Sequence, residues 1–361
     1  MNNNSSKIAG LKRPDQIKAW LDERVIGQDD AKITLSVAVY NHYKRLLHKE
    51  GPSGRVRIDK SNIILLGETG CGKTLLMKSI AEFLDVPCYI QDCTKITASG
   101  YVGSDVEDCL VGLLRTCNYD MDRAQRGIVI LDEGDKIARK EAGVSITRDV
   151  SGECVQQSLL KIVEGDLVGV PPMGGRKHPE QPLLYIDTSN ILFVVSGAFV
   201  GLEDIVARRI GADRNRIGFR DTPAERMPSC LGEVSPADLR EFGFIPEFIG
   251  RFPVITHVDS LGGEELLRIL TEPRNAIISQ YVELLRQDGI TLSFGEDALR
   301  AVVDETLRLG TGARGLRLVL ERSMRDIMFR APALAAAGKR KICIKADDII
   351  GASCKEIRKA E

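Results

Sequence analysis

The chain has 361 residues, of which 28% are charged and 43% hydrophobic, and its 50 Lys and Arg nearly balance 51 Asp and Glu. This length suits two domains, and this composition is typical of a soluble globular protein. Because the balanced charge provides no global basic field, polyanion binding would have to be local, and we expect no nucleic-acid partner.

The N-terminal residues and the cysteines argue against further classes of protein. Residues 1–15 hold no apolar segment of signal-peptide length, and no later run reaches the roughly 18 uncharged apolar residues of a membrane span. We therefore expect no membrane association and a cytoplasmic location. The nine cysteines are scattered without a C-x-x-C pair beside only four histidines, so we expect neither a zinc site nor a disulfide framework.

Along the chain, residues 1–13 are predicted to be a flexible segment, and residues 14–49 to form two helices separated by "ERVIGQDD". Short apolar runs then alternate with helical patterns. Such runs, hydrophobic on both faces, predict a mostly parallel sheet covered by helices on both sides, and thus an α/β domain over 14–258. The five runs are 62–67, 86–92, 127–133, 190–197 and 252–258.

After "DSLGG" the pattern changes to two amphipathic helices, a short strand at 290–294, two more helices and a last strand near 340–346. This predicts a smaller, mostly helical α/β domain over 259–355, joined to the first by a glycine-containing hinge.

The run "GETGCGKT" fits G-x-x-x-x-G-K-[ST] between a predicted strand and a predicted helix. Glycines there let backbone N–H groups point at phosphates, while Lys73 would reach the β- and γ-phosphates of ATP and Thr74 would bind Mg²⁺. The alternative is a chance glycine-rich turn, which the flanking strand and helix disfavour. The candidate nucleotide-binding residues are Gly67, Glu68, Thr69, Gly70, Cys71, Gly72, Lys73 and Thr74.

The run "GIVILDEGDK" ends a predicted strand with Asp132 and Glu133, as a Walker B site does. A strand end can place Asp132 at Mg²⁺ and leave Glu133 to orient the attacking water. An acidic pair alone is usually a solvated turn, but together with the phosphate loop the catalytic interpretation is favoured.

Two arginines are candidates for stabilising charge on the γ-phosphate. Arg251 lies in "PEFIGRFP", at the start of the last strand of the large domain, and Arg314 lies in "GTGARGLR", at the predicted start of a helix. Most arginines are surface salt-bridge partners, so composition alone favours neither.

Many runs occur together in an order that closely resembles the ClpX family, the AAA+ unfoldases that partner the ClpP peptidase. The resemblance covers roughly residues 14–350 and is far more specific than a phosphate loop alone. It implies an AAA+ P-loop NTPase fold with a small C-terminal lid domain. The runs are "VIGQDDAK", "AVYNHYKR", "GETGCGKT", "GYVGSDVED", "AQRGIVILDEGDKIARK", "SITRDVSGECVQQSLLKIVEG", "PPMGGRKHP", "IPEFIGRFP" and "TGARGLR".

The resemblance also implies roles for particular residues. Val25 and Ile26 are similar to the pair that contacts adenine, Arg251 to the arginine finger offered to a neighbouring subunit, and Arg314 to the sensor-2 arginine that couples nucleotide state to rotation of the small domain. An arginine that acts in trans implies a ring, and the family forms homohexamers. The implied activity is ATP-dependent unfolding of tagged proteins through a pore, with delivery to ClpP.

Three axial loops follow from the same comparison. Tyr101 and Val102 resemble the pair that grips substrate in the pore, and Arg148 lies in a run resembling a second pore loop. Arg176, Lys177 and His178 resemble the basic loop at the pore mouth that helps to select tags, although a basic cluster alone is more often a solvated turn.

The tripeptide Ile217, Gly218 and Phe219 matches the hook that family members insert into the ClpP ring. Exposed hydrophobic residues on a charged loop suit docking, whereas the alternative is a loop folded onto its own domain.

The chain departs from the family pattern at three places. The cysteine-rich zinc module that usually precedes the core is not part of this sequence, which leaves open any substrate delivery that depends on it, whereas we expect ATPase and core unfoldase activity. Gly134 replaces an aliphatic residue and is expected to loosen the strand end by up to about 1 kcal/mol, with slower or unchanged hydrolysis. Arg220 follows the hook where the family often has a small residue, which makes docking less certain than ATP use.

Two other classes of function compete with the unfoldase. A nucleic-acid remodeller shares the ATPase core but needs a basic channel with stacking aromatics, and the only tryptophan, Trp20, lies in the N-terminal helix. A scaffold that binds nucleotide without turnover is disfavoured by the presence of Glu133 and Arg251.

Overall fold

The computed structural model describes residues 10–48, 56, 58–96, 105–139, 152–172, 182–214 and 230–350. Contacts divide the chain into two compact units. The first unit takes its residues from Met1–Ala19, Asp29–Glu68 and Lys73–Asp259, and the second from Trp20–Gln28, Thr69–Gly72 and Ser260–Glu361. Two short segments of the N-terminal half therefore associate with the C-terminal residues.

The first unit is built on a five-stranded parallel sheet in the order β2-β3-β6-β1-β7. The three central strands are almost entirely buried, because helices cover both faces, whereas the edge strands β2 and β7 are only partly buried. The predicted parallel sheet is confirmed. The strands are β1 (Ile63–Leu66), β2 (Cys88–Asp92), β3 (Ile128–Asp132), β6 (Leu192–Gly197) and β7 (Val254–His257).

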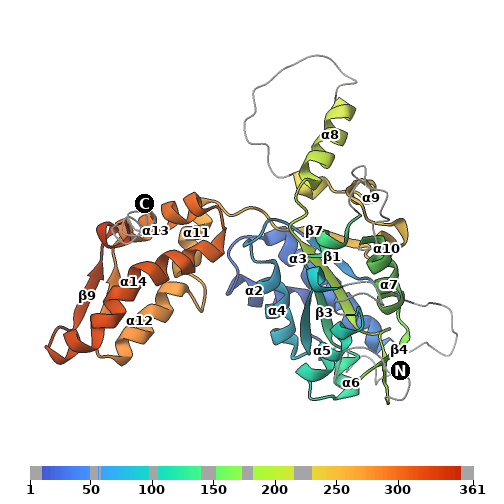
Figure 1. The fold of residues 1–361 in the computed structure, drawn as a ribbon, viewed down its shortest axis with the longest axis horizontal. Coiled ribbons are helices and arrows are strands. Elements are labelled where there is room, and N and C mark those ends of the chain that lie inside the picture. Colours follow the sequence, from blue (N-terminus) through green and yellow to red (C-terminus); the bar gives the residue numbers. More distant parts are fainter. Residues whose placement is uncertain are drawn as a thin grey trace. The chain divides into compact units, whose positions relative to one another are not determined.

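Alternate residues of the central strands face opposite helical layers. Leu66, Leu131 and Val195 share one core with residues of α5, α7, α8, α9 and α10. Figure 1 shows α4 on the other side of the sheet from α7 and α10. The helices that lie wholly or mainly in this unit are α2 (Pro14–Asp22), α3 (Asp29–Leu47), α4 (Lys73–Leu84), α5 (Asp108–Thr116), α6 (Met121–Ala124), α7 (Gly152–Glu164), α8 (Leu202–Arg214), α9 (Pro236–Phe242) and α10 (Pro246–Gly250), with short 3-10 turns η1 (Cys93–Lys95), η2 (Gly134–Ile137) and η3 (Cys230–Glu233).

An antiparallel pair, β4 (Leu167–Val170) and β5 (Leu184–Asp187), forms a separate small sheet that the sequence did not predict. Its two ends flank residues 173–181, which include the predicted basic loop. The large side chains Leu167 and Tyr185 are 62% and 59% exposed, so the pair shows no continuous buried run.

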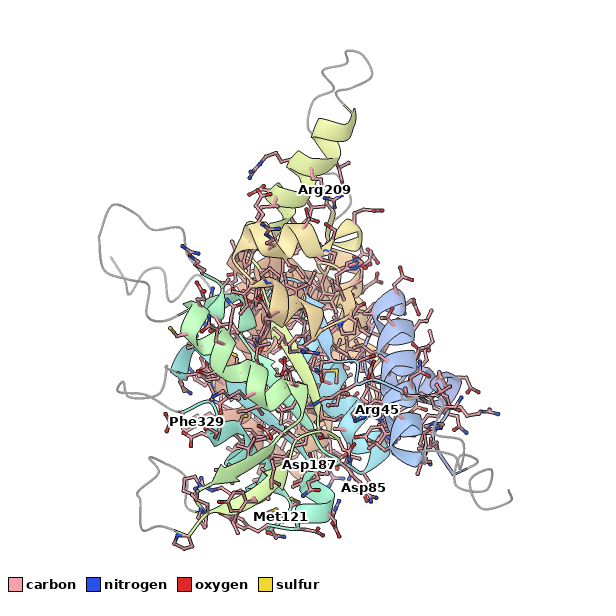
Figure 2. All side chains as sticks on the ribbon, turned by 90° about the vertical axis from the view of Figure 1, so that its right-hand side faces the viewer. Arg45, Asp85, Met121, Asp187, Arg209 and Phe329 are labelled. Atoms are coloured by element: carbon pink, nitrogen blue, oxygen red, sulfur yellow. The ribbon has the colours of Figure 1, made fainter. Side chains whose placement is uncertain are left out.

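Helix α8 leads toward the segment that contains the predicted hook, and its middle is fixed to α9. Arg209 on α8 (Figure 2) donates to both carboxylate oxygens of Asp238, at 2.8 and 2.9 Å, and to the carbonyl of Glu233 at 2.6 Å. Burial alone would raise the pKa of Asp238, but hydrogen bonds from Arg209 and Ser235 outweigh it and hold that pKa below its usual range. The ion pair therefore anchors α8 at the point where it leaves the core.

The second unit is mostly helical and has its own core. Its two strands, β8 (Thr291–Phe294) and β9 (Lys341–Ile344), pair in parallel. Residues from all four long helices are fully buried together, among them Leu270, Leu285 and Leu320. The predicted succession of two helices, a strand, two helices and a strand is confirmed. The helices are α11 (Gly263–Thr271), α12 (Ile277–Gln287), α13 (Glu296–Leu309) and α14 (Ala313–Ala336).

Within the described ranges, no helix is both long and apolar enough to cross a membrane. The same residues contain no group of three His, Cys, Asp or Glu side chains placed to hold a metal ion.

A buried histidine makes the stability of the first unit sensitive to acid. His42 on α3 is 4% exposed, and its Nε2 lies 3.1 Å from the carbonyl oxygen of Asn190. Burial, reinforced by the nearby charges of Arg45 and Lys60, lowers the pKa of His42 from 6.5 to about 3. The folded protein therefore keeps this ring neutral over a pH range in which the unfolded chain binds a proton.

We expect the free energy of unfolding to fall as the pH drops from 6.5 toward 3, with a slope from this residue that approaches about 1.4 kcal/mol per pH unit. Urea unfolding at a series of pH values measures this slope. In His42→Gln the slope should be shallower, because glutamine does not titrate, whereas His48→Gln, at a solvent-exposed position on the same segment, is the matched control. A slope unchanged in His42→Gln would contradict this assignment.

Candidate active site

The phosphate-binding loop, residues 67–74, connects β1 to α4. Its glycines Gly67, Gly70 and Gly72 all have positive φ values, of 138°, 89° and 97°. A Cβ atom at Gly67 would lie 2.4 Å from the side chain of Val258, so no larger residue fits at that position. Glycine is thus required here both for backbone conformation and for space, which favours a built anion-binding loop over a chance turn.

Lys73 is the first residue of α4 and is 8% exposed. Its Nζ donates to the carbonyl oxygens of Gly67 at 2.5 Å and Glu68 at 2.8 Å. The ammonium group is therefore held over the loop, where phosphate oxygens can replace the carbonyls as acceptors.

Thr74 and Asp132 meet at the ends of their elements. Thr74 Oγ1 donates to Asp132 Oδ2 at 3.4 Å. Two ligands at neighbouring positions of an octahedral Mg²⁺ ion, each about 2.1 Å from the metal, lie about 3 Å apart. The hydroxyl and carboxylate oxygens are thus close to the spacing that this ion requires, and their chemistry suits it.

The carboxylate of Asp132 is held from two further directions. Ser196 Oγ donates to Asp132 Oδ1 at 2.7 Å, and the N–H of Glu133 donates to the same oxygen at 3.0 Å. Ser196 lies on β6, which runs beside β3. Sequence reasoning missed this serine, although a lone hydroxyl at the end of an otherwise apolar strand was a usable signal.

Glu133 is exposed, while its neighbours Asp132 and Gly134 are more buried. Its backbone is in the left-handed region, with φ 54° and ψ 36°, which is uncommon for a residue other than glycine. This turn sends the Glu133 side chain into solvent while Asp132 stays at the strand end. The two carboxylates are therefore separated as a metal ligand and a water-orienting group would need.

Gly134 is buried against β6. A Cβ atom there would lie 2.4 Å from Cγ1 of Val195. An aliphatic residue at position 134 would therefore clash with Val195 unless Val195 shifted or were replaced by a smaller residue. The Val195 side chain thus occupies the space that a side chain at position 134 would need. The expected effect of Gly134 on the rate of hydrolysis stays a prediction.

Arg251 lies at the C-terminal end of α10, just before β7. Its guanidinium contacts Glu164, the last residue of α7, with Nη2 2.7 Å and Nε 2.9 Å from Oε1. Asn62 Nδ2 donates to the carbonyl of Arg251 at 2.9 Å. Both side chains of the ion pair are about half exposed, at 52% and 43%, so the arginine is at the surface of the first unit.

Within the second unit, the phosphate-loop segment 69–72 contacts two other predicted parts of the nucleotide site. Gly70 accepts a hydrogen bond from the N–H of Ala313 at 3.3 Å, immediately before the exposed Arg314 on the first turn of α14. A Cβ atom at Gly72 would lie 3.9 Å from Cγ1 of Val25. Val25 and the following Ile26 are both buried, at 6% exposure, and their adenine-contacting role stays a prediction.

The remaining predicted site residues lie outside the described residues. These are the predicted pore residues Tyr101, Val102 and Arg148, the basic residues Arg176, Lys177 and His178, and the hook residues Ile217, Gly218 and Phe219. The described elements bracket them: η1 and α5 flank the first pore segment, and α7 begins directly after the second.

A fully buried glutamine links the region after Asp132 with the segment before Arg251. Gln156 on α7 donates from Nε2 to the carbonyls of Ile137 at 2.8 Å and Gly243 at 3.2 Å, and its Oε1 accepts from the N–H of Ile245 at 2.9 Å. Sequence reasoning missed this residue as well. One side chain on α7 thus satisfies three backbone groups from two other segments.

We expect Gln156→Leu to lower the free energy of unfolding by about 3 kcal/mol, because it removes all three hydrogen bonds and leaves the carbonyl of Ile137 and the N–H of Ile245 without them. Urea unfolding measures the difference. Gln157→Leu, at the neighbouring exposed position, should change stability by less than about 0.5 kcal/mol. Equal losses in the two variants would show that the three hydrogen bonds contribute nothing specific.

Comparisons with known proteins agree with this geometry. A family model described as "AAA domain (Cdc48 subfamily)" matches residues 58–255, and one described as the C-terminal D2-small domain of ClpB protein matches residues 261–341. The "ATP-dependent Clp protease ATP-binding subunit ClpX" of Porphyromonas gingivalis is 51% identical over 343 residues, which are 94% of this chain and 82% of that protein. The protein of the same name from Borrelia duttonii is 47% identical, again over 94% of this chain and over 79% of its own length.

Proposed function

Because the chain belongs to the ClpX family of AAA+ ATPases, we propose that it is a protein unfoldase and translocase that pulls tagged proteins through the pore of a homohexamer. The family identifies it as an AAA+ Clp ATPase subunit that binds nucleotide. Unfolding, translocation and delivery of substrates to a ClpP-type peptidase are the further steps of the proposal, and its place of action is the cytoplasm.

In the proposed mechanism, the phosphate-binding loop holds ATP through its backbone N–H groups and Lys73. Thr74 and Asp132 would hold Mg²⁺, which would neutralise negative charge on the phosphates of ATP. Glu133 accepts a hydrogen bond from the attacking water and orients it toward the γ-phosphate. Arg251 of the neighbouring subunit stabilises the charge that develops there, and Arg314 transmits the nucleotide state to the second unit.

The mechanical part of the proposal assigns Tyr101 and Val102 to gripping. Glycines on both sides would let this segment swing, and an aromatic ring makes favourable contacts with almost any side chain. Arg148 would contact the chain farther along the pore, and Arg176, Lys177 and His178 would select tags at its mouth. The hook residues Ile217, Gly218 and Phe219 would dock on the peptidase.

The single observation that most supports hydrolysis rather than mere nucleotide binding is the arrangement at the end of β3. Asp132 is fixed by Thr74, Ser196 and its own neighbour, while Glu133 is left exposed for a water molecule. A scaffold that only bound nucleotide would not need this second carboxylate in a rare backbone conformation.

The proposal can be tested by asking which macromolecule, an unfolded protein or DNA, raises the rate of ATP hydrolysis by the assembled hexamer. We expect an unfolded protein bearing a recognised tag to raise the steady-state ATPase rate, and single-stranded or duplex DNA to leave it unchanged. Stimulation by DNA and not by unfolded protein would favour a nucleic-acid remodeller instead. An assembled hexamer with no ATPase activity in either condition would overturn the enzymatic assignment.

A further inference from the structure

We infer that Glu164 is a positioning residue for Arg251. It holds the guanidinium so that the end formed by the two Nη atoms faces the neighbouring subunit. The inference rests on the proposed trans role of Arg251 and adds a residue that this role requires.

The geometry of the ion pair is specific. A guanidinium group has one edge formed by Nε and Nη2 and an end formed by its two Nη atoms. Glu164 Oε1 takes the first edge, at 2.9 Å from Nε and 2.7 Å from Nη2. Nη1 points away from the carboxylate, so a phosphate group can approach the end of the guanidinium without breaking both of these contacts.

The backbone on each side of the pair is fixed by one short segment before β1. Asn62 Nδ2 donates to the carbonyl of Arg251 at 2.9 Å, and its Oδ1 accepts from the N–H of Phe193 at 3.1 Å. Lys60 Nζ donates to the carbonyl of Val163, directly before Glu164, at 3.1 Å. The two partners of the ion pair are thus positioned relative to the same strand.

The turn that follows Glu164 is equally constrained. Gly165 has a φ of 102°, and a Cβ atom there would lie 2.9 Å from Cα of Ser189. Lys60 also donates to the carbonyl of Thr188 at 3.0 Å, next to that contact. Helix α7 therefore ends at a fixed position, and the Glu164 side chain projects from a backbone that cannot easily shift.

The contacts around the Glu164–Arg251 pair indicate that the pair orients the arginine and does not mainly stabilise the fold. Half-exposed ion pairs contribute little to stability, because solvent screens them and both side chains lose conformational freedom. An arginine that must meet a phosphate across a subunit boundary gains from being held beforehand, because small displacements of a catalytic group lower rates strongly. The carboxylate is thus expected to act on the rate of the neighbouring active site.

Two substitutions test whether the Glu164 carboxylate orients Arg251 for the phosphate or instead competes with the phosphate for it. The amide oxygen of Glu164→Gln can still accept from Nε and Nη2, whereas Glu164→Ala removes both contacts. We expect kcat for ATP to fall about threefold in Glu164→Gln and about tenfold in Glu164→Ala, with KM nearly unchanged. A kcat equal to or above that of the original protein in Glu164→Ala would overturn the inference, because it would show that the carboxylate is idle or withholds the arginine.

The matched control is a second exposed Arg–Glu pair in the same unit. Arg208 Nη1 lies 2.9 Å from Glu241 Oε1, and the side chains are 70% and 54% exposed. Glu241→Ala should leave kcat unchanged. A fall in kcat as large as that of Glu164→Ala would assign the effect to surface charge in general and overturn the specific role of Glu164.

Mixed hexamers test whether the effect crosses the subunit boundary. Subunits with Glu133→Gln serve as donors that supply Arg251 but do not hydrolyse ATP, and they are mixed with unmodified subunits. Adding Glu164→Ala to the donors should lower hydrolysis by their unmodified neighbours, and adding Arg251→Ala should lower it further. If Arg251→Ala donors cause no fall, the proposed trans mechanism fails. If they cause a fall and Glu164→Ala donors do not, only the positioning role fails.

Discussion

Glu133→Gln is expected to lower the rate of ATP hydrolysis by about 10²- to 10⁴-fold while ATP still binds. Glutamine keeps the size of the side chain and its exposed position, but its neutral amide oxygen is a much weaker hydrogen-bond acceptor for the attacking water than a carboxylate. The contacts that hold Lys73, Thr74 and Asp132 do not involve the Glu133 side chain, so the affinity for nucleotide should be preserved. Steady-state hydrolysis and equilibrium binding of a fluorescent ATP analogue measure the two quantities.

Asp132→Asn gives the contrasting result. It weakens the hydrogen bonds from Thr74 and Ser196 and removes the charge proposed for Mg²⁺, so both Mg²⁺-dependent binding and hydrolysis should fall. Glu247→Gln, at an exposed position on α10, controls for loss of an acidic side chain and should change neither. If Glu133→Gln kept hydrolysis within about tenfold of the original rate, the assignment of Glu133 as the water-orienting residue would be wrong.

Tyr101→Ala is expected to slow the unfolding of a stable tagged protein at least about tenfold, with the ATPase rate within about twofold of the original. The ring provides most of the contact area by which the pore would hold a chain, and without it each power stroke would slip. Unfolding is followed by loss of fluorescence of a tagged fluorescent protein, and hydrolysis is measured in the same reaction. Val102→Ala should also slow unfolding, by a smaller factor.

Tyr119→Ala is the matched control, because Tyr119 is a tyrosine of the same unit that is 40% exposed and lies outside the segments proposed for the pore. It should leave both unfolding and hydrolysis unchanged. Unfolding by Tyr101→Ala as fast as by the original protein, with ATPase intact, would end the proposed gripping role.

The five main strands could be predicted because each is marked by a pattern of neighbouring residues in the sequence. Each central strand is buried on both faces, so it appears in the sequence as a continuous apolar run followed by a helical pattern. The pair β4 and β5 has the opposite character. Leu167 and Tyr185 are apolar but exposed, so apolar residues here do not mark a buried strand, and the register between the strands pairs residues up to 20 positions apart, such as Leu167 and Asp187.

The ends of the strands carry site residues that the motifs identify, but the contacts that hold these residues are long-range. Ser196 and Asp132 are 64 residues apart, and Arg251 and Glu164 are 87 apart. No local pattern encodes such pairs, because they depend on strand order and on where helices end. The left-handed conformation of Glu133 could not be predicted from the sequence either. Glycine is the usual marker of a positive φ, and the glycine here is the next residue, Gly134.

Gly134 shows that the effect of a glycine also depends on packing that its residue type does not reveal. By its type it is predicted to loosen the end of β3, and in the structure its neighbour Val195 occupies the space that a side chain would take. The conformational freedom of a glycine and the packing that the same glycine permits have opposite effects on stability, and only the second depends on the tertiary structure.

The most direct test of ATP-driven pulling is degradation of a tagged, stably folded protein by the hexamer, with and without an added ClpP-type peptidase. With ATP and the peptidase, we expect the folded substrate to be converted to peptides, and with ATP alone to be unfolded but not cleaved. A non-hydrolysable ATP analogue should give neither result. If the substrate stayed folded while ATP was hydrolysed at the normal rate, the claim that this ATPase unfolds and translocates proteins would be contradicted.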